Sequence, residues 1–220
     1  MTASLTKITT AQEALSRLED GMTIMVGGFL GVGSPDALID EIIRRGVRDL
    51  TLIANDNAMP DRGYGKLFVT GQVRRLICSY TGLNPTAIAQ QLDGSIEVEL
   101  VPQGTLAERV RAGGAGLGGF LTPTGVGTIV EEGKQKLTID GRTYLLELPL
   151  KADVALVGAH VADTFGNLVY RKSARNFNPL MAMAAAYTVA QAKTVVKMGE
   201  IDPDHVMTPG VFVNAVVEVA

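Results

Sequence analysis

The feature that most constrains the fold is a strand, glycine turn, helix and strand unit near the start of the chain. Met22–Val26 is a continuous apolar run of strand length, and it leads into a glycine-rich turn at Gly27–Gly33. An apolar stripe at helical spacing follows and stops at Gly46, and Leu50–Ala54 reads as a second buried strand. Two buried strands joined through a helix favour parallel pairing with a right-handed crossover.

Strand and helix signals continue to alternate along the chain. Ser34 and Pro35 predict the cap and first turn of the helix after the glycine turn, and Thr10 with Glu13 forms a capping box for a short helix before Gly21. Further strands are expected at Arg74–Tyr80, Ile96–Val101, Val154–Ala159 and Thr194–Val196, and further helices at Asn84–Leu92, Thr105–Arg111 and Leu180–Ala186.

This alternation predicts an α/β fold with an open, mostly parallel sheet flanked by helices. Gly113–Gly127 is expected to be a long glycine-rich loop insertion of the functional or lid-like kind. Lys136–Leu148, turning at Asp140-Gly141, is expected to be a hairpin. Because no linker-like stretch or fixed-period repeat divides the chain, residues 1–220 are expected to form a single domain.

Composition excludes several classes of function. The net charge of −3 argues against a nucleic-acid partner, and no apolar run reaches the roughly 18 residues of a membrane span. The first ten residues lack the pattern of a secretory signal, and one cysteine, Cys78, fits a reducing compartment. We therefore expect a cytoplasmic protein without a membrane association. His160 and His205 have no Cys or acidic cluster at ligand spacing, so no metal site is expected.

The glycine turn is the first candidate for chemistry. Its glycines lie at positions 27, 28, 31 and 33, where they allow positive φ and a close approach of the backbone to a ligand. The start of the following helix offers N–H groups and partial positive charge to a phosphate or an oxyanion. The spacing fits neither a Walker loop nor G-x-G-x-x-G. From the residues alone, a ligand-binding loop and a tight structural turn both remain open.

The whole string Asp20–Pro35 resembles the first signature of the family I CoA-transferases: an acidic residue and Gly, a short apolar strand, Gly-Gly-Phe, then Gly and Pro. Four further stretches are similar to the α subunits of that family: Leu52–Asp56, Val101–Arg109, Gly113–Phe120 and Lys172–Pro179. The resemblance covers about residues 19–209. It is closest to acetate or acetoacetate CoA-transferases of short-chain fatty-acid metabolism, a branch of lipid metabolism.

The resemblance implies a transferase that moves CoA between a short-chain acyl-CoA and a free carboxylic acid by a ping-pong mechanism. It implies CoA and acyl-CoA as substrates, with no permanently bound cofactor. The family's catalytic glutamate lies in a Ser-Glu-Asn-Gly motif, which these 220 residues lack. No catalytic residue is therefore expected in this chain, and the glutamate is expected on a β subunit, in an αβ heterodimer, an α2β2 tetramer or a larger assembly. The CoA-binding loop implied for this chain comprises Gly27, Gly28, Phe29, Leu30, Gly31, Val32 and Gly33.

Transfer through an anhydride and a thioester develops an oxyanion at each step, which calls for fixed N–H donors. Gln103 is the first candidate for contact with the oxyanion or the substrate, because the family pattern places an amide there, and Asn55 is the second. Gly116–Gly119 offers backbone amides or a lid hinge. A simpler interpretation makes Gln103 a cap of the helix near Thr105.

Other residues also allow two interpretations. Arg171, Lys172 and Arg175 form either a solvated basic face or a phosphate contact, and Cys78 is expected to be buried and inert. For the chain as a whole, two alternatives stand beside the transferase subunit. One is a non-catalytic CoA- or nucleotide-binding module, and the other is a protein like ribose-phosphate isomerase, against which the Gly-Gly-Phe signature argues.

Overall fold

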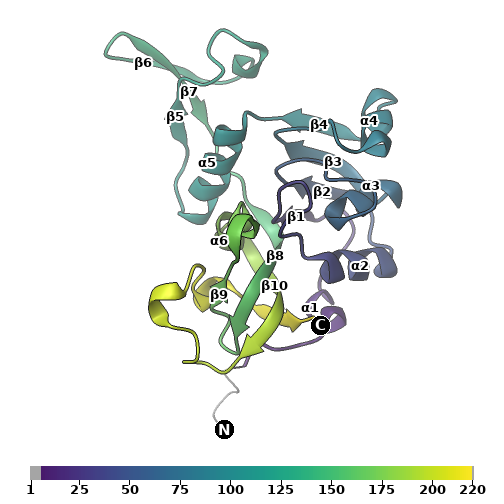
Figure 1. The fold of residues 1–220 in the computed structure, drawn as a ribbon. Coiled ribbons are helices and arrows are strands. Elements are labelled where there is room, and N and C mark those ends of the chain that lie inside the picture. Colours follow the sequence, from purple (N-terminus) through teal and green to yellow (C-terminus); the bar gives the residue numbers. More distant parts are fainter. Residues whose placement is uncertain (1–5, 220) are drawn as a thin grey trace.

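The computed structural model describes residues 6–219, and its centre is an eight-stranded sheet (Figure 1). Seven of the strands follow the order β11-β10-β8-β1-β2-β3-β4, and every pairing along this path is parallel. The eighth, β9, pairs with β8 in the antiparallel sense. The strands are β1 Thr23–Val26, β2 Leu50–Ile53, β3 Val73–Cys78, β4 Glu97–Leu100, β8 Ala152–Asp163, β9 Leu168–Val169, β10 Ala185–Val196 and β11 Ala215–Glu218. The α/β class and the mostly parallel sheet are thus confirmed.

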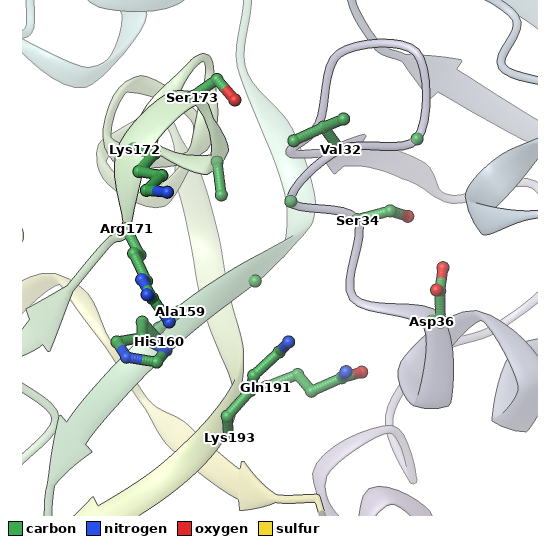
Figure 2. Close-up of a pocket in the computed structure, with 14 residues that line it drawn as sticks. Val32, Ser34, Asp36, Ala159, His160, Arg171, Lys172, Ser173, Gln191 and Lys193 are labelled. Atoms are coloured by element: carbon green, nitrogen blue, oxygen red, sulfur yellow. The ribbon is translucent and has the colours of Figure 1, made fainter.

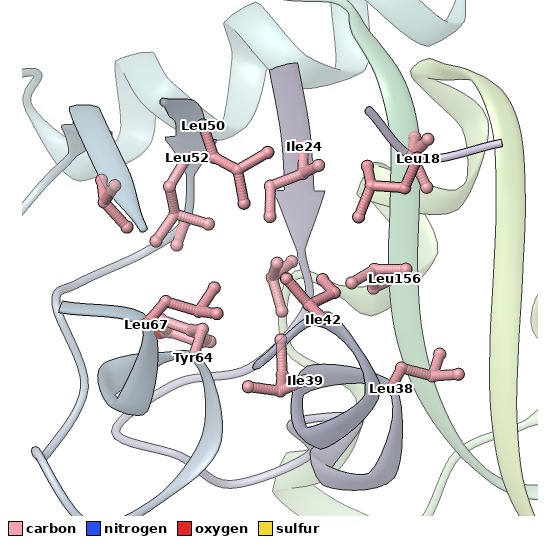
Figure 3. Close-up of a cluster of buried hydrophobic side chains, with 14 of the residues drawn as sticks. Leu18, Ile24, Leu38, Ile39, Ile42, Leu50, Leu52, Tyr64, Leu67 and Leu156 are labelled. Carbon is pink, nitrogen blue, oxygen red and sulfur yellow. The ribbon is translucent and has the colours of Figure 1, made fainter. Parts of the chain in front are cut away.

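Helices cover both faces of this sheet. The helices are α1 Ala11–Ala14, α2 Asp36–Arg45, α3 Lys66–Val69, α4 Pro85–Leu92, α5 Gln103–Gly114 and α6 Asn178–Met183. The apolar residues of α1 to α4 enter one hydrophobic core, and those of α5 and α6 enter a second. Figure 3 shows the first core, where Leu38, Ile39 and Ile42 of α2 pack against Ile24 of β1 and Leu52 of β2.

Neighbouring residues of one strand serve different cores, because successive side chains of a strand point to opposite faces. Ile24 belongs to the first core and Met25 to the second, and Leu52 and Ile53 divide in the same way. The strands therefore read as continuous apolar runs in the sequence, which is typical of parallel sheets that are buried on both sides.

The strand order reverses once, between β1 and β8. From β1 the sheet grows through β2 and β3 to β4, with the connecting helices on the face of the first core. The chain then crosses to the other face through α5, and β8 returns to pair with β1. Because crossovers are right-handed, strands that are added in opposite directions along the sheet place their connecting helices on opposite faces. The carboxyl ends of β1 and β8 therefore border the topological switch point of the sheet.

A second, three-stranded antiparallel sheet extends beyond α5 (Figure 1). It consists of β5 Phe120–Thr122, β6 Lys136–Ile139 and β7 Arg142–Glu147. The expected hairpin is confirmed: Asp140 and Gly141 have φ values of 49° and 76°, as a turn with two left-handed residues requires.

The expected loop at Gly113–Gly127 is wrong at its start and is interrupted by a strand, while residues 123–127 do form a loop. Gly113 and Gly114 are the last turn of α5, and residues 120–122 form β5. A Cβ on Gly113 would collide with the carbonyl of Leu150, and one on Gly114 would lie 2.8 Å from Cβ of Met183. These two glycines therefore serve helix packing, and not a mobile loop.

The expected cap of α2 is also wrong. Pro35, and not Ser34, is the N-cap residue of α2, and neither side chain makes a capping bond. Instead, Oε1 of Gln191 in β10 accepts hydrogen bonds from the backbone N–H groups of Ala37 (2.8 Å) and Leu38 (3.4 Å). The capping box of Thr10 and Glu13 and the Asn84 cap of α4 are confirmed.

Element boundaries differ most in the second half of the chain. Strand β10 is much longer than the expected Thr194–Val196, and it begins where the expected helix at Leu180–Ala186 was to end. Strand β8 extends past the expected Val154–Ala159, and β11 was not expected.

None of the helices formed by residues 6–219 has the length and hydrophobicity that a membrane crossing needs. The expectation that the chain lacks a secretory signal rests on its first ten residues, and residues 1–5 lie outside the part of the chain that the structure describes.

Candidate active site

The glycine turn after β1 is a tight loop with an apolar tip. Phe29 and Val32 exchange two backbone hydrogen bonds, of 3.1 and 2.9 Å, across Leu30 and Gly31. Both central residues have positive φ, 51° at Leu30 and 81° at Gly31. The side chains of Phe29, Leu30 and Val32 are 39%, 39% and 48% exposed. The loop therefore presents apolar side chains to its surroundings at the carboxyl edge of the sheet.

Two asparagines hold this loop: Asn176, which lies before α6, and Asn178, which is the first residue of α6. Asn176 accepts a hydrogen bond from the N–H of Gly28 (3.1 Å) and donates one to the carbonyl of Val32 (2.9 Å). Asn178 is buried; it donates to the carbonyl of Gly33 (3.1 Å) and accepts from the N–H of Gly158 in β8 (2.8 Å). The stretch 172–179 thus fixes both limbs of the glycine turn against β8.

The glycines at the base of the loop are required by the protein itself. A Cβ on Gly27 would collide with the side chain of Asn178, and one on Gly33 would lie 2.7 Å from the carbonyl oxygen of Ala174. Gly28 and Gly33 also have positive φ, of 134° and 79°. These contacts favour the interpretation of a tight structural turn for the base, while the exposed tip leaves room for a ligand.

On one side of the loop, a chain of hydrogen bonds joins it to Gln103. The N–H of Leu30 donates to Oδ2 of Asp56 (3.0 Å), which also accepts from Nδ2 of Asn55 (2.8 Å). Oδ1 of Asn55 in turn accepts from Nε2 of Gln103 (2.7 Å). We call Leu30, Asp56, Asn55 and Gln103 the amide network. Its residues follow β1, β2 and β4, whose carboxyl ends meet at one edge because the strands are parallel.

The two candidate amides differ in access. Asn55 is 2% exposed and both ends of its amide are paired within the network, whereas Gln103 is exposed at the first residue of α5. The capping interpretation of Gln103 is wrong, because its side chain makes no bond to the start of the helix. An amide nitrogen carries two hydrogens, so Gln103 keeps one donor beyond its bond to Asn55.

Asp56 is fully buried and was not singled out from the sequence. Its Oδ1 accepts hydrogen bonds from the N–H of Ala58 (2.7 Å) and the hydroxyl of Tyr64 (3.0 Å). Burial, followed by the negative charge of Asp56, raises the pKa of Tyr64 well above its ordinary value, so this hydroxyl remains a donor. In the sequence, Asp56 is marked by its place shortly after a buried strand and by the family-like stretch Leu52–Asp56.

Cys78 lies in the first core. It is fully buried, as expected, and burial raises the pKa of its thiol to about 12. The reactive form of cysteine is the thiolate, and a raised pKa disfavours it. We therefore still predict that Cys78 is chemically inert.

On the other side of the loop lies a cavity of about 650 Å³ (Figure 2). It is bordered by residues 31–34 and 36, by residues 158–160 of β8, by residues 171–174, and by Gln191 and Lys193 of β10. Of the basic group noted in the sequence, Arg171 and Lys172 line this cavity and Arg175 does not. His160 and Lys193 join them, and neither carried a signal in the sequence that pointed to a site. Among residues 6–219, no group of three or more His, Cys, Asp or Glu could hold a metal ion.

Comparison with known proteins matches nearly the whole chain. The family model described as Coenzyme A transferase matches residues 8–219. Acetate CoA-transferase subunit alpha of Escherichia coli (strain K12) is 57% identical over 212 residues, which is 96% of each chain. Acetoacetyl-CoA:acetate/butyrate CoA transferase alpha subunit of Clostridium acetobutylicum is 48% identical over 96% of this chain and 97% of that relative.

A solved structure shares the fold. Acyl-CoA transferase YdiF from Escherichia coli O157:H7, in a thioester complex with CoA, has a TM-score of 0.87 at 23% identity. The match covers 97% of this chain and 47% of that one, so this chain spans about half of the length of YdiF.

Proposed function

The chain belongs to the coenzyme A transferase family, and from this premise we propose that it is the α subunit of an enzyme that moves CoA between a short-chain acyl-CoA and a free carboxylic acid. The observation that carries the proposal is the 57% identity, over 96% of both chains, to an acetate CoA-transferase subunit alpha. The relative that acts on acetoacetyl-CoA and acetate or butyrate supports the same range of small acids.

We further propose that a β subunit supplies the nucleophile, a glutamate in a Ser-Glu-Asn-Gly motif. The relatives are subunits by name, and this chain lacks that motif. The carboxylate would attack the acyl-CoA thioester to give an anhydride and CoA thiolate, and the thiolate would then attack the anhydride to leave a glutamyl-CoA thioester and the free acid. The acceptor acid reverses these steps. CoA is thus part of the substrate and is held covalently in the glutamyl-CoA intermediate. The proposed assembly is an αβ or α2β2 complex of the cytoplasm.

The α subunit contributes positioning and charge stabilisation in this proposal. The remaining N–H of the Gln103 amide is the donor offered to the developing oxyanion, and Asn55 holds that amide from behind. The loop from Gly27 to Gly33 borders the path of the acyl-CoA. Residues 1–220 act as one domain, in which the second sheet is joined to the first through α5 and β8.

The test is to purify the chain with and without its β partner. With the partner, exchange of CoA between acetyl-CoA and acetoacetate or butyrate should be rapid; without it, exchange should be absent. Incubation of the complex with acetyl-CoA alone should attach CoA covalently to the β subunit, which intact-mass spectrometry detects. Exchange by the partner-free chain, or a complex that binds acyl-CoA without exchange, would contradict the proposal. The second outcome is what a non-catalytic binding module predicts.

A further inference from the structure

The cavity beside the glycine loop lies where the topology of the sheet predicts a ligand. It is bordered by the turn after β1 and by Gly158, Ala159 and His160 of β8, the two strands between which the strand order reverses. In open α/β sheets, ligands bind outside the carboxyl ends of the strands at such a switch point. The amide network lies on the other side of the same loop, so the cavity is a separate region.

Four basic side chains gather in this cavity. In Figure 2, Arg171, Lys172, His160 and Lys193 lie on the side that faces Val32, Ser34 and Asp36 across the hollow. Within residues 6–219, none of the four forms an ion pair or a side-chain hydrogen bond, and Asp36 is the one carboxylate in the lining. The chain as a whole has a net charge of −3, so this local excess of positive charge runs against the overall sign.

The lining also settles which groups are free to bind. The N–H groups of Ala37 and Leu38 in the first turn of α2 are not free, because Oε1 of Gln191 already accepts from both. The hydroxyl of Ser34 is not available either, because its oxygen is buried and points away from the four basic side chains (Figure 2). A Cβ on Gly158 would lie 2.5 Å from the carbonyl oxygen of Gly33, so β8 and the loop meet without a side chain between them. An anion in the cavity would thus be bound by side chains, next to the backbone of β8 and of the glycine loop.

We propose that this cavity binds the phosphate groups of a nucleotide-like ligand through Arg171, Lys172 and Lys193. Guanidinium and ammonium groups form strong charge-assisted hydrogen bonds with phosphate oxygens, and three of them match a ligand with more than one phosphate. His160, which also lines the cavity, supplies a further donor.

Two ligands carry this chemistry. One is the acyl-CoA substrate, with its pyrophosphate and 3′-phosphate, and that source rests on the proposed function. It would place the phosphates on one side of the glycine loop and the thioester near Gln103 on the other. The second is a free nucleotide. The experiment below separates the two.

The kinetic arm uses the complex of this chain with its β partner. Arg171→Ala and Lys193→Ala should each raise KM for acetyl-CoA about tenfold, the loss expected for a charged hydrogen bond, with kcat unchanged. With acetyl-pantetheine, which lacks the phosphates, both variants should match the parent complex. Lys197→Ala removes the same charge from an exposed position that does not line the cavity, and it should behave as the parent.

The binding arm uses calorimetry with adenosine 3′,5′-bisphosphate on the same complexes. A roughly tenfold loss of affinity in both cavity variants, without a change in KM for acetyl-CoA, identifies a free nucleotide as the ligand. Wild-type affinity and wild-type KM in both folded variants would overturn the inference while leaving the transferase proposal intact. A complex without any exchange activity would overturn that proposal instead, and the calorimetry would still test the cavity. Circular dichroism verifies that each variant is folded.

Discussion

Asn55 shows how a buried residue can set the position of an exposed one. Its amide accepts from Gln103 on one side and donates to Asp56 on the other, and Asp56 also holds the N–H of Leu30. Through this network, the start of α5 and the tip of the glycine loop are fixed to the same carboxyl end of β2. An unsatisfied buried amide is costly, so the orientation of Asn55 is well determined.

The first prediction concerns Gln103 in the assembled enzyme. Gln103→Ala should lower kcat by about 10- to 1000-fold, as loss of one oxyanion donor does, and should change KM much less. The melting temperature should fall only slightly, because the side chain is exposed and caps no helix, and the hydroxyl of Ser79 still lies 3.3 Å from Oδ1 of the buried Asn55. Steady-state kinetics and thermal melts on one preparation test both statements.

Gln91→Ala is the matched control, since it removes an exposed glutamine side chain from α4, and it should leave kcat unchanged. A normal kcat with a lowered melting temperature in Gln103→Ala would show that the amide serves stability alone.

At the residue scale, the sequence pointed to some of the site and missed the rest for physical reasons. Gln103 and Asn55 were both expected, from strand ends and from the family pattern, and they lie in hydrogen-bond contact. The role of Gln191 as the cap of α2 could not be expected, because it depends on β10 lying beside α2, 154 residues further along the chain. Local capping rules describe only neighbours in sequence.

At the scale of elements, one carboxylate joins two strands and a helix. Glu99 of β4 contacts Nη2 of Arg75 in β3 (2.8 Å) and Nη1 of Arg109 in α5 (2.7 Å). Arg109 also donates from Nε to the carbonyl of Leu148 (2.9 Å). Burial opposes the ionisation of Glu99, but the hydrogen bonds and charges of the two arginines hold its pKa below the ordinary value of 4.5.

The second prediction follows from that lowered pKa. A carboxyl with a depressed folded-state pKa stabilises the fold fully above about pH 4.5, and the contribution is lost as the pH falls through the folded-state pKa. Glu99→Gln should therefore reduce the free energy of unfolding at pH 7 by on the order of 1 kcal/mol, and the difference from the parent should shrink in acid. Urea denaturation across this pH range measures it.

Glu97→Gln in the same strand is the control. Glu97 is 62% exposed, and its carboxylate lies 3.5 Å from Nε of Arg75, a longer and weaker contact than those of Glu99. It should change stability by a few tenths of a kcal/mol at most. A difference between Glu99→Gln and the parent that grows in acid would contradict the assignment of the lowered pKa to the arginines.

The same scale shows which elements the sequence could predict. The helices with local caps and the apolar strands of the first half were expected close to their observed bounds, as α4 and its Asn84 cap illustrate. The errors gather where tertiary contacts replace local signals. Gly113 and Gly114 look like a loop in the sequence, yet they let α5 pack closely on Leu150 and Met183. Strand β11 was not expected.

At the scale of the whole molecule, the sheet is assembled out of chain order. Strand β1 is central, with β2 on one side and β8 on the other. The N–H of Thr23 in β1 is paired with Asp153 of β8, 130 residues later in the chain. The class of fold could be predicted from alternation alone, but this return to β1 could not, because nothing local in β8 specifies its neighbour.

That return has a consequence for biosynthesis. A ribosome delivers β1 to β4 and their helices well before β8, so during this interval β1 is an edge strand with apolar residues Ile24–Val26 and open backbone groups. Such an edge is a template for pairing with other chains. The nascent chain is therefore most prone to aggregation after β4 has emerged and before β8 has docked.

The third prediction tests this interval. A fragment of residues 1–150 should sediment as aggregates under conditions in which the full chain stays dispersed, and synthesis paused at that length should recruit a holdase chaperone. Co-expression of residues 151–220 should reduce the aggregation, because β8 can then cover β1 in trans. If the fragment of residues 1–150 is instead monomeric and unfolds cooperatively, then β1 to β4 fold stably without β8, and the prediction is wrong.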